Sequence, residues 1–390
     1  MSCYVASNDN RIYAALETDF GQVGTVTAEN RLPAIKLGIA QRTEQPERRD
    51  KTGGRTFLGL PNGFRKTVDY ELTTYMTAWD TVNPAPCYGP LFQAGLGGAG
   101  LEFPGRTIQT VVDPTRFQTT VAHGLTIGQA VRFGGELRFV TAIVDPATFI
   151  INAPFLTTPV ASSELGASVT YTLAKDLLSV SLFDHWIPDT TVQRIVSGGA
   201  VDRLRVRVNG DFHQFTFSGP AAELIDSSTF SGGIGGLTSF PSEPAGPLVN
   251  FSLVPGSLGQ VWLGTVPSQF HTLLTADVIL DNGIDLRVRE FGEARPRCLL
   301  AGRRRVSVNL DLVSDTEPET SALYQAAAQR DPISLMFQLG QTESHLCAVY
   351  LPIVIPEVPE FNDDDARLEW HFRNSRAQGI ADDELVIAFG

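Results

Sequence analysis

The sequence predicts a mainly β protein with short flanking helices and a small all-β domain inserted into a larger one. Three observations lead to this prediction. Apolar and polar residues alternate in many short segments, which is the period of a half-buried strand. The 390 residues include 36 glycines and 24 prolines and are 43% hydrophobic, a composition that suits short strands joined by tight turns. Two segments have the features of a helix.

The first 64 residues form a predicted N-terminal arm that contains few periodic segments. Residues 34–40 are its strand candidate. The stretch after it, residues 41–54 (QRTEQPERRDKTGG), has no large apolar residue and therefore cannot bury itself. It is either a solvated loop or a long hairpin that becomes ordered against a neighbouring subunit, where its Glu and Arg side chains could pair across the interface.

Residues 66–79 (KTVDYELTTYMTAW) predict a long antiparallel strand with one wet face. Val68, Tyr70, Leu72 and Met76 fall on the apolar side of the alternation. A short helix is predicted near residues 88–94, after a turn bounded by proline and before Gly95.

Residues 107–175 predict the inserted domain. Strands of five to eight residues are separated there by Asp113-Pro114, Gly124, Gly134-Gly135 and Asp145-Pro146, and no helical pattern occurs. This spacing is typical of a small barrel or sandwich. The larger domain then consists of residues 1–106 and 176–390, and the two ends of the insertion should lie close together at the surface.

The remaining strands are predicted at residues 178–183, 191–196 and 201–217, the last reversing at Asn209-Gly210, a hairpin-turn dipeptide. Residues 218–260 form a predicted long loop. Strands at 260–263, 277–280 and 286–291 precede a strand, helix and two strands in residues 303–355. Thr316 and Glu319 have the spacing of a capping box, and Asp331-Pro332 ends the helix. Residues 366–372 and 384–389 are the closing strands.

Composition argues against several function classes. A net charge of −13 disfavours general nucleic-acid binding, which needs surplus Lys and Arg. The four cysteines are far apart without a CxxC pair, which favours a reduced protein of the cytoplasm. The opening residues are polar, unlike a signal peptide, and no apolar run reaches the length of a membrane span. No metal-ligand spacing, phosphate loop or catalytic set is found, so we expect no cofactor and no enzyme activity.

Two charged stretches need partners. Residues 287–305 contain seven arginines, which we expect to pair with the acidic C-terminal residues 357–390 or with a neighbouring subunit. The acidic turn at residues 362–365 lacks the alternating ligands and distant Glu of a calcium loop, so a solvated turn is the favoured interpretation.

The order of these elements resembles the major tail tube proteins of long-tailed, siphovirus-like bacteriophages. About half of the chain carries the resemblance, which is one of pattern and order. The matching segments are residues 66–79 with the turn and helix after them, GGAVDRLRVRV (198–208), TADVILDNGIDLRV (275–288), RRRVSVNLDL (303–312) with its acidic loop and Ala-rich helix, DPISLMFQLG (331–340) and DDELVIAFG (382–390).

The resemblance implies a tail-tube-type antiparallel β-sandwich or barrel that assembles into homo-hexameric rings. The rings would stack into a hollow tube around a tape-measure protein, between a tail terminator and baseplate proteins. Double-stranded DNA would pass down the lumen without specific binding. The protein would occupy the virion tail after assembly in the host cytoplasm. The insertion and the 220–260 loop depart from a minimal tube protein and resemble extra β-domains that some such proteins carry outside the tail.

Two sets of residues are candidates for these roles. A polar or acidic lumen would let DNA slide, and the wet face of the 66–79 strand and its analogue near residue 310 supply candidate lumen-facing residues: Asp69, Glu71, Thr73, Asn309 and Asp311. The alternative is that they face another subunit or outer solvent. The candidate ring-to-ring contact is the charged loop: Glu44, Glu47, Arg48, Arg49, Asp50 and Lys51.

Two other function classes stay open. One is a different tail component, such as a terminator or baseplate ring built on a related sandwich. The other is a glycan-binding or hydrolytic multi-domain β protein with the insertion as its binding module. For the latter the sequence offers no aromatic cluster on a short loop and no carboxylate pair that can be placed.

Overall fold

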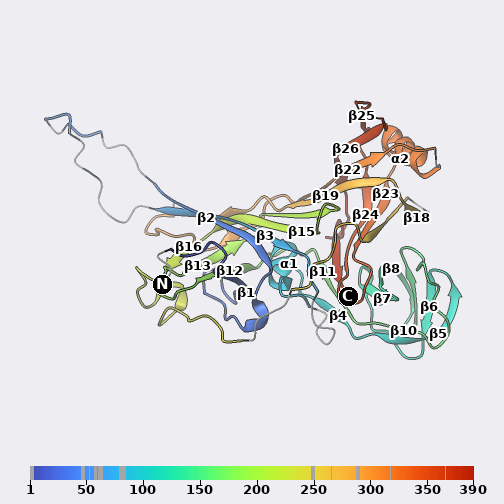
Figure 1. The fold of residues 1–390 in the computed structure, drawn as a ribbon, viewed down its shortest axis with the longest axis horizontal. Helices are drawn as coiled ribbons and strands as arrows, with labels where there is room; N and C mark the ends of the chain where they lie inside the picture. The colour runs from blue at the N-terminus through green and yellow to red at the C-terminus, as the bar shows by residue number, and fades with distance from the viewer. Residues whose placement is uncertain are drawn as a thin grey trace.

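The computed structural model describes residues 4–390 apart from 45–48, 52, 57–58, 60–64, 79–84, 247–250, 265, 287–289, 317 and 365. It confirms the predicted mainly β class, with large antiparallel sheets, one of which closes almost into a barrel (Figure 1). Two α-helices lie where helices were predicted, α1 (Gly89–Leu96) and α2 (Pro318–Gln329), and the short 3-10 helices are η1 (Ala28–Asn30) and η2 (Ile234–Gly236).

The largest sheet contains fifteen of the described strands. Its first section runs in the order β2 (Ala34–Thr43), β3 (Lys66–Tyr75), β15 (Gln214–Ala221), β14 (Arg203–Val208), β19 (Leu273–Asp281), β22 (Arg305–Val313) and β26 (Glu369–Ala377). Its second section continues through β24 (Cys347–Ile355), β23 (Ile333–Leu339), β17 (Gly259–Leu263) and β18 (Ser268–Phe270), with β25 (Glu360–Asn362), β27 (Val386–Phe389), β11 (Ser168–Thr172) and β4 (Leu101–Phe103) alongside.

The alternation in β3 sets the inner face of the first section. Val68, Tyr70 and Leu72 are buried as predicted, and the residues between them point outward. Thr74 lies on the same side of β3 and is also buried, although it is polar; its hydroxyl donates to the Pro33 carbonyl at 3.1 Å. Trp79, placed at the end of this strand by the sequence, lies outside the described residues.

A second, four-stranded sheet packs against this inner face in the order β1 (Asn10–Leu16), β12 (Ser179–Trp186), β13 (Arg194–Ala200) and β16 (Glu223–Asp226). Both sheets and α1 contribute to one core. Phe92 of α1 is fully buried at its centre, with ring centroids 5.1 Å from Phe215 and 5.2 Å from Phe217. The layered arrangement is therefore a sandwich with a helix buried inside it.

The outer face of the four-stranded sheet is covered by the chain itself. Tyr13, Phe183 and Ile195 of that face pack with Phe230 and Phe240 of the segment that comes after β16. The loop predicted at residues 218–260 begins later than expected, because β15 and β16 occupy residues up to 226. It lies against the sheet because it carries apolar residues that the sheet buries.

The inserted domain is a six-stranded sheet with its own core. The strand order is β10 (Glu164–Leu165), β5 (Arg106–Asp113), β6 (Arg116–Thr119), β9 (Thr148–Ile151), β8 (Glu136–Asp145) and β7 (Ala130–Phe133). Its two ends lie side by side, because Phe103 of β4 is directly opposite Ser168 of β11.

Two strands predicted from sequence need correction. The segment at 168–172 was placed in the insertion, but β11 pairs with β27 and β4 of the large sheet, where Val169 and Tyr171 join the main core. Of the strand predicted at 286–291, Leu286 belongs to the short β20 (Asp285–Leu286), which pairs with β21 (Leu299–Leu300), whereas Phe291 is fully exposed and is not in a strand. Residues 287–289 lie outside the described part.

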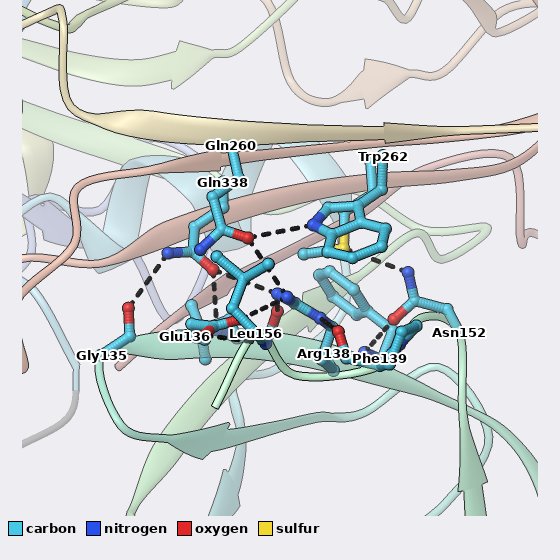
Figure 2. A network of polar contacts seen from close by, with 12 residues as sticks. Gly135, Glu136, Arg138, Phe139, Asn152, Leu156, Gln260, Trp262 and Gln338 are labelled. Atoms are coloured by element: carbon cyan, nitrogen blue, oxygen red, sulfur yellow. Dashed lines mark hydrogen bonds and ion pairs between the residues drawn. The ribbon is translucent and has the colours of Figure 1, made fainter. Parts of the chain in front are cut away.

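A buried polar network joins the insertion to the large sheet (Figure 2). Arg138 of β8 is fully buried; it donates to the Pro154 carbonyl at 2.9 Å and to Gln260 Oε1 at 3.2 Å, and it forms an ion pair with Glu136. Gln338 of β23 accepts from the Leu137 amide at 2.9 Å and donates to the Gly135 carbonyl at 3.1 Å. These side-chain hydrogen bonds hold the insertion against the large sheet, in addition to its two chain connections.

Candidate functional site

One face of the large sheet is mostly polar from β3 to β22; Ile279, opposite Arg205 and Ser307, is an apolar residue on it. In antiparallel pairs, directly opposite residues share a face and have Cβ atoms about 4.5–5.5 Å apart. The register runs from Glu71 to Ser218, Arg203, Asp281 and Arg305, and each of these residues is directly opposite the next. We call the following set the polar face: Asp69, Glu71 and Thr73 of β3; Gln214, Thr216 and Ser218 of β15; Arg203, Arg205 and Arg207 of β14; Thr275, Asp277 and Asp281 of β19; Arg305, Ser307, Asn309 and Asp311 of β22.

The five candidate lumen residues all lie on this face, although β15, β14 and β19 stand between their two strands in the sheet. Asp69 and Glu71 are exposed, and Thr73 is half-buried with its hydroxyl 3.5 Å from that of Thr216. Asn309 is half-buried and accepts the Asn374 amide at 2.8 Å. The structure therefore brings the two groups onto one surface; whether that surface lines a lumen stays a prediction.

The Asp311 carboxylate is bonded to three neighbouring side chains. Its carboxylate lies 2.6 Å from His371 Nδ1 and 2.7 Å from Arg373 Nη1, and it accepts the Thr275 hydroxyl at 2.8 Å. Burial raises the pKa of this carboxyl, but the hydrogen bonds from His371 and Thr275 outweigh that effect and the pKa is lowered overall. Asp311 therefore fixes β26 against β22 and stays ionised.

The three arginines of β14 were not predicted as site residues. Arg205 donates to both oxygens of Asp277, at 2.9 and 2.6 Å, and this contact raises its pKa. Arg203 and Arg207 are exposed and have no ion-pair partner among the described residues. The signal was in the sequence, since Arg and apolar residues alternate from 203 to 208. The face is therefore mixed in charge rather than acidic.

The candidate ring-to-ring residues lie on the connection between β2 and β3. These strands pair from Thr43 and Lys66 inward, and the Glu44 amide donates to the Arg65 carbonyl at 2.9 Å. β2 and β3 thus form a hairpin, and Figure 1 shows the paired strands leading away from the body, opposite the insertion. Arg49, Asp50 and Lys51 are exposed. Glu47 and Arg48 lie outside the described residues.

Three aromatic rings meet at the edge of the sheet beside α2. Phe361 of β25 stacks on Trp370 of β26, with centroids 5.3 Å apart and planes at 8°, and Tyr324 of α2 lies 5.5 Å from Trp370. Phe361 is 56% exposed. The sequence showed no aromatic cluster on a short loop; this one is assembled from three separate elements, so spacing along the chain could not reveal it.

Potential metal ligands are scattered over the fold. Within the described ranges, no three His, Cys, Asp or Glu side chains are grouped so that they could hold a metal ion. None of the helices in the described part is long and apolar enough to cross a membrane.

Comparison with known proteins gives little further information. No protein-family model and no curated protein sequence matches this chain. Among solved structures, the chain is similar to the tail tube of SPP1, determined by solid-state NMR and cryo-EM, with 12% identity over 35% of this chain and 79% of that one and a TM-score of 0.28. A likeness of that size does not support an inference about fold or function, so the function has to be inferred from the geometry of this chain.

Proposed function

We propose that this chain is a structural, non-enzymatic subunit of a bacteriophage tail tube, assembling into stacked homo-hexameric rings that conduct double-stranded DNA. The observation that carries the proposal is the polar face: a broad, outward-facing, mostly polar surface, interrupted by Ile279, on a sheet whose other face is a hydrophobic core. Such a surface suits the wall of a water-filled conduit. The order of elements, which resembles tail tube proteins, points to the same role.

The free edge of the sheet supports assembly. β2 stands at the end of the strand order, and its outer edge has no strand partner in the part of the chain that is described. An exposed edge invites pairing with another strand. A ring of subunits joined edge to edge would satisfy these backbone groups and continue the polar face from one subunit to the next.

The charges of the polar face suit passage without binding. Asp69 and Glu71 repel phosphates, and Arg205 is neutralised by Asp277. Tight DNA binding requires many unneutralised Lys and Arg contacts to phosphates. Arg203, Arg207 and Arg305 are not paired with any described residue, but the face also carries the carboxylates Asp69, Glu71 and Asp281. Because the charges are mixed, DNA would slide past this surface, with the tape-measure protein occupying the lumen beforehand.

The β2–β3 hairpin is proposed as the ring-to-ring contact. Its described charged residues, Glu44, Arg49, Asp50 and Lys51, are placed on the end of the hairpin that leads away from the body. Replacing residues 44–65 with a two-residue turn should leave rings but prevent tubes. Normal tubes formed by this variant would exclude that role.

The experiment that tests the proposal is negative-stain electron microscopy of the purified protein over a concentration series. Hollow tubes or six-fold rings are expected, with the insertion as a knob on the outside. Short, closed ring stacks that never lengthen would favour a tail terminator or baseplate ring instead. Monomers at every concentration, with and without added tail-tip proteins, would refute the assembly proposal.

One observation favours glycan binding as a second candidate function. The stacked pair Phe361–Trp370, with Phe361 more than half exposed, is the kind of flat aromatic surface on which sugar rings pack. Glycan-array binding that is lost in Phe361→Ala would support this function, and an array without signal would remove it.

A further inference from the structure

A cleft of about 720 Å³ opens where β26 ends and the segment before β22 begins. Its lining includes four cationic side chains, Lys175, Arg303, Arg304 and Arg376. On a chain with a net charge of −13, such a grouping of positive charge is unusual. The sequence predicted that arginines of this region would pair either with the C-terminal segment or with a neighbouring subunit.

The structure divides the three arginines of the cleft, Arg303 and Arg304 of that region and Arg376 of β26, into two kinds. The charge of Arg304 is neutralised within the chain: it forms ion pairs with Asp382 and, at 3.0 Å, with Glu384, and it donates to the Ala174 carbonyl at 3.2 Å. Arg303 and Arg376 are exposed and have no ion-pair or hydrogen-bond partner for their side chains among the described residues. Asp176 is the single lining carboxylate that Arg304 does not engage. The cleft therefore holds four cationic side chains against three carboxylates, and neither Arg303 nor Arg376 forms an ion pair with a described residue.

A matching negative element lies elsewhere on the surface. Asp363 and Asp364 occupy the turn between β25 and β26, and both are exposed. Within the described part of this turn, the Asp364 amide donates to Asn362 Oδ1 at 3.1 Å. Their carboxylates have no partner in the described structure.

These two elements cannot meet within one chain. The acidic turn precedes Glu369 at one end of β26, whereas Arg376 stands at the other end of the same strand. At a rise of about 3.3 Å per residue, the nine-residue strand holds them about 25 Å apart. A rigid strand in the middle of a sheet prevents either end from folding back on the other.

We infer that the cleft bearing Arg303 and Arg376 receives the Asp363–Asp364 turn of a second copy of this chain. Because the two surfaces differ, the contact is heterologous, and repeating it gives a closed ring when the rotation between copies closes. The inference rests on the proposed homo-oligomeric function and specifies which surfaces meet. Opposite charges brought together also select the correct neighbour, since like charges across the contact would repel.

A charge exchange tests this contact. The cleft variant is Arg303→Glu/Arg376→Glu, the turn variant is Asp363→Lys/Asp364→Lys, and a third protein carries both pairs of substitutions. All four positions are exposed, so we expect each variant to fold, which circular dichroism would verify. A matched control, Asp19→Lys/Glu29→Lys, makes the same change in net charge as the turn variant at exposed positions away from both surfaces.

Association is measured by sedimentation velocity at low and moderate salt. We expect each single-surface variant to need at least about tenfold more protein to assemble than the wild type, because like charges across an interface cost more than about 1.4 kcal/mol. The double exchange should recover wild-type assembly to within about threefold, and the control should behave as the wild type.

The outcomes separate this inference from the proposed function. If the wild type assembles and the turn variant assembles equally well, the turn is not the occupant and the inference is wrong while the proposed function stands. If only the cleft variant is impaired and the double exchange does not recover, another acidic segment fills the cleft and the inference is again wrong. A wild type that never self-associates overturns the proposed function and this contact with it.

Discussion

The junction between the insertion and the large sheet depends on one buried cation, Arg138. Substituting Arg138→Met keeps most of the side-chain volume but leaves Glu136, which is 5% exposed, as a buried carboxylate without its counter-charge. It also removes donors from the Pro154 carbonyl and from Gln260. Removing one partner of a buried ion pair costs about 3–5 kcal/mol. Burial already lowers the pKa of Arg138 to about 10, against the opposing effect of Glu136, so the cation remains charged at neutral pH.

Hydrogen exchange measured by mass spectrometry is the suitable assay, since a chain of several cores need not unfold in one step. The free energy of opening of β8 should fall by about 3–5 kcal/mol, which corresponds to exchange about 10²–10⁴-fold faster for amides that exchange through this opening. Amides of β3, in the main core, should change little. The exposed pair Arg205–Asp277 provides a matched control, because Arg205→Met should cost only about 0–1 kcal/mol.

A second variant distinguishes the loss of the counter-charge from a loss of packing. In Arg138→Met/Glu136→Gln the buried charge is removed, and the amide oxygen can still accept from the Leu156 amide, which lies 3.1 Å from Glu136. This double variant should recover most of the lost protection. If Arg138→Met costs less than about 1 kcal/mol, or if the double variant is no better than the single one, uncompensated burial of Glu136 is not what the junction depends on.

The core, the covering segment and the polar face supply three other predictions. Phe92→Ala should destabilise the sandwich by about 3–5 kcal/mol in denaturant unfolding, because Phe92 is fully buried; the fully exposed Phe291→Ala should change it by less than about 0.5 kcal/mol. Glu243 lies in the segment after β16 that covers the four-stranded sheet, and it accepts a hydrogen bond from Arg11 of β1. This bond lowers the pKa of the Glu243 carboxyl below the usual 4.5. The stabilisation by the ionised Glu243 carboxylate is therefore complete above about pH 4.5 and is lost as the pH falls through the lowered pKa. Proteolysis of the segment after β16 should accelerate only at acidic pH. In Glu243→Gln this pH dependence should be absent. In phage particles, Asp69→Lys/Glu71→Lys should permit assembly but slow DNA ejection, as monitored by the fluorescence of a DNA-binding dye; unchanged ejection would count against a lumen role.

Much of the fold was predictable because burial follows local pattern. The alternation of Val68, Tyr70 and Leu72 specifies which side of β3 faces the core, and the structure confirms it. Both helices were predicted from turn and capping residues, and the inserted sheet from its evenly spaced turns. Each of these features leaves a local pattern of apolar, turn or capping residues in the sequence.

The candidate site was predicted only in part. The sequence indicated that Asp69 and Asp311 lie on polar strand faces, but not that one continuous surface contains both, nor that His371 and Arg373 enclose Asp311. Likewise, the alternation of Glu136 and Arg138 resembles a solvent-facing strand, yet both side chains are buried, and Arg138 donates to Gln260 and Gln338 from distant strands.

The sequence by itself determined which residues face inward in strands with a clear alternation, such as β3, and where many of the turns lie. Only the tertiary structure decided which strands are neighbours, and so it placed β11 beside β27 rather than in the insertion. The physical reason is that a period of two is a property of a single strand, whereas pairing and register are decided by the burial of all the apolar faces together. Polar groups such as Arg138 become buried or exposed as a consequence of that global arrangement.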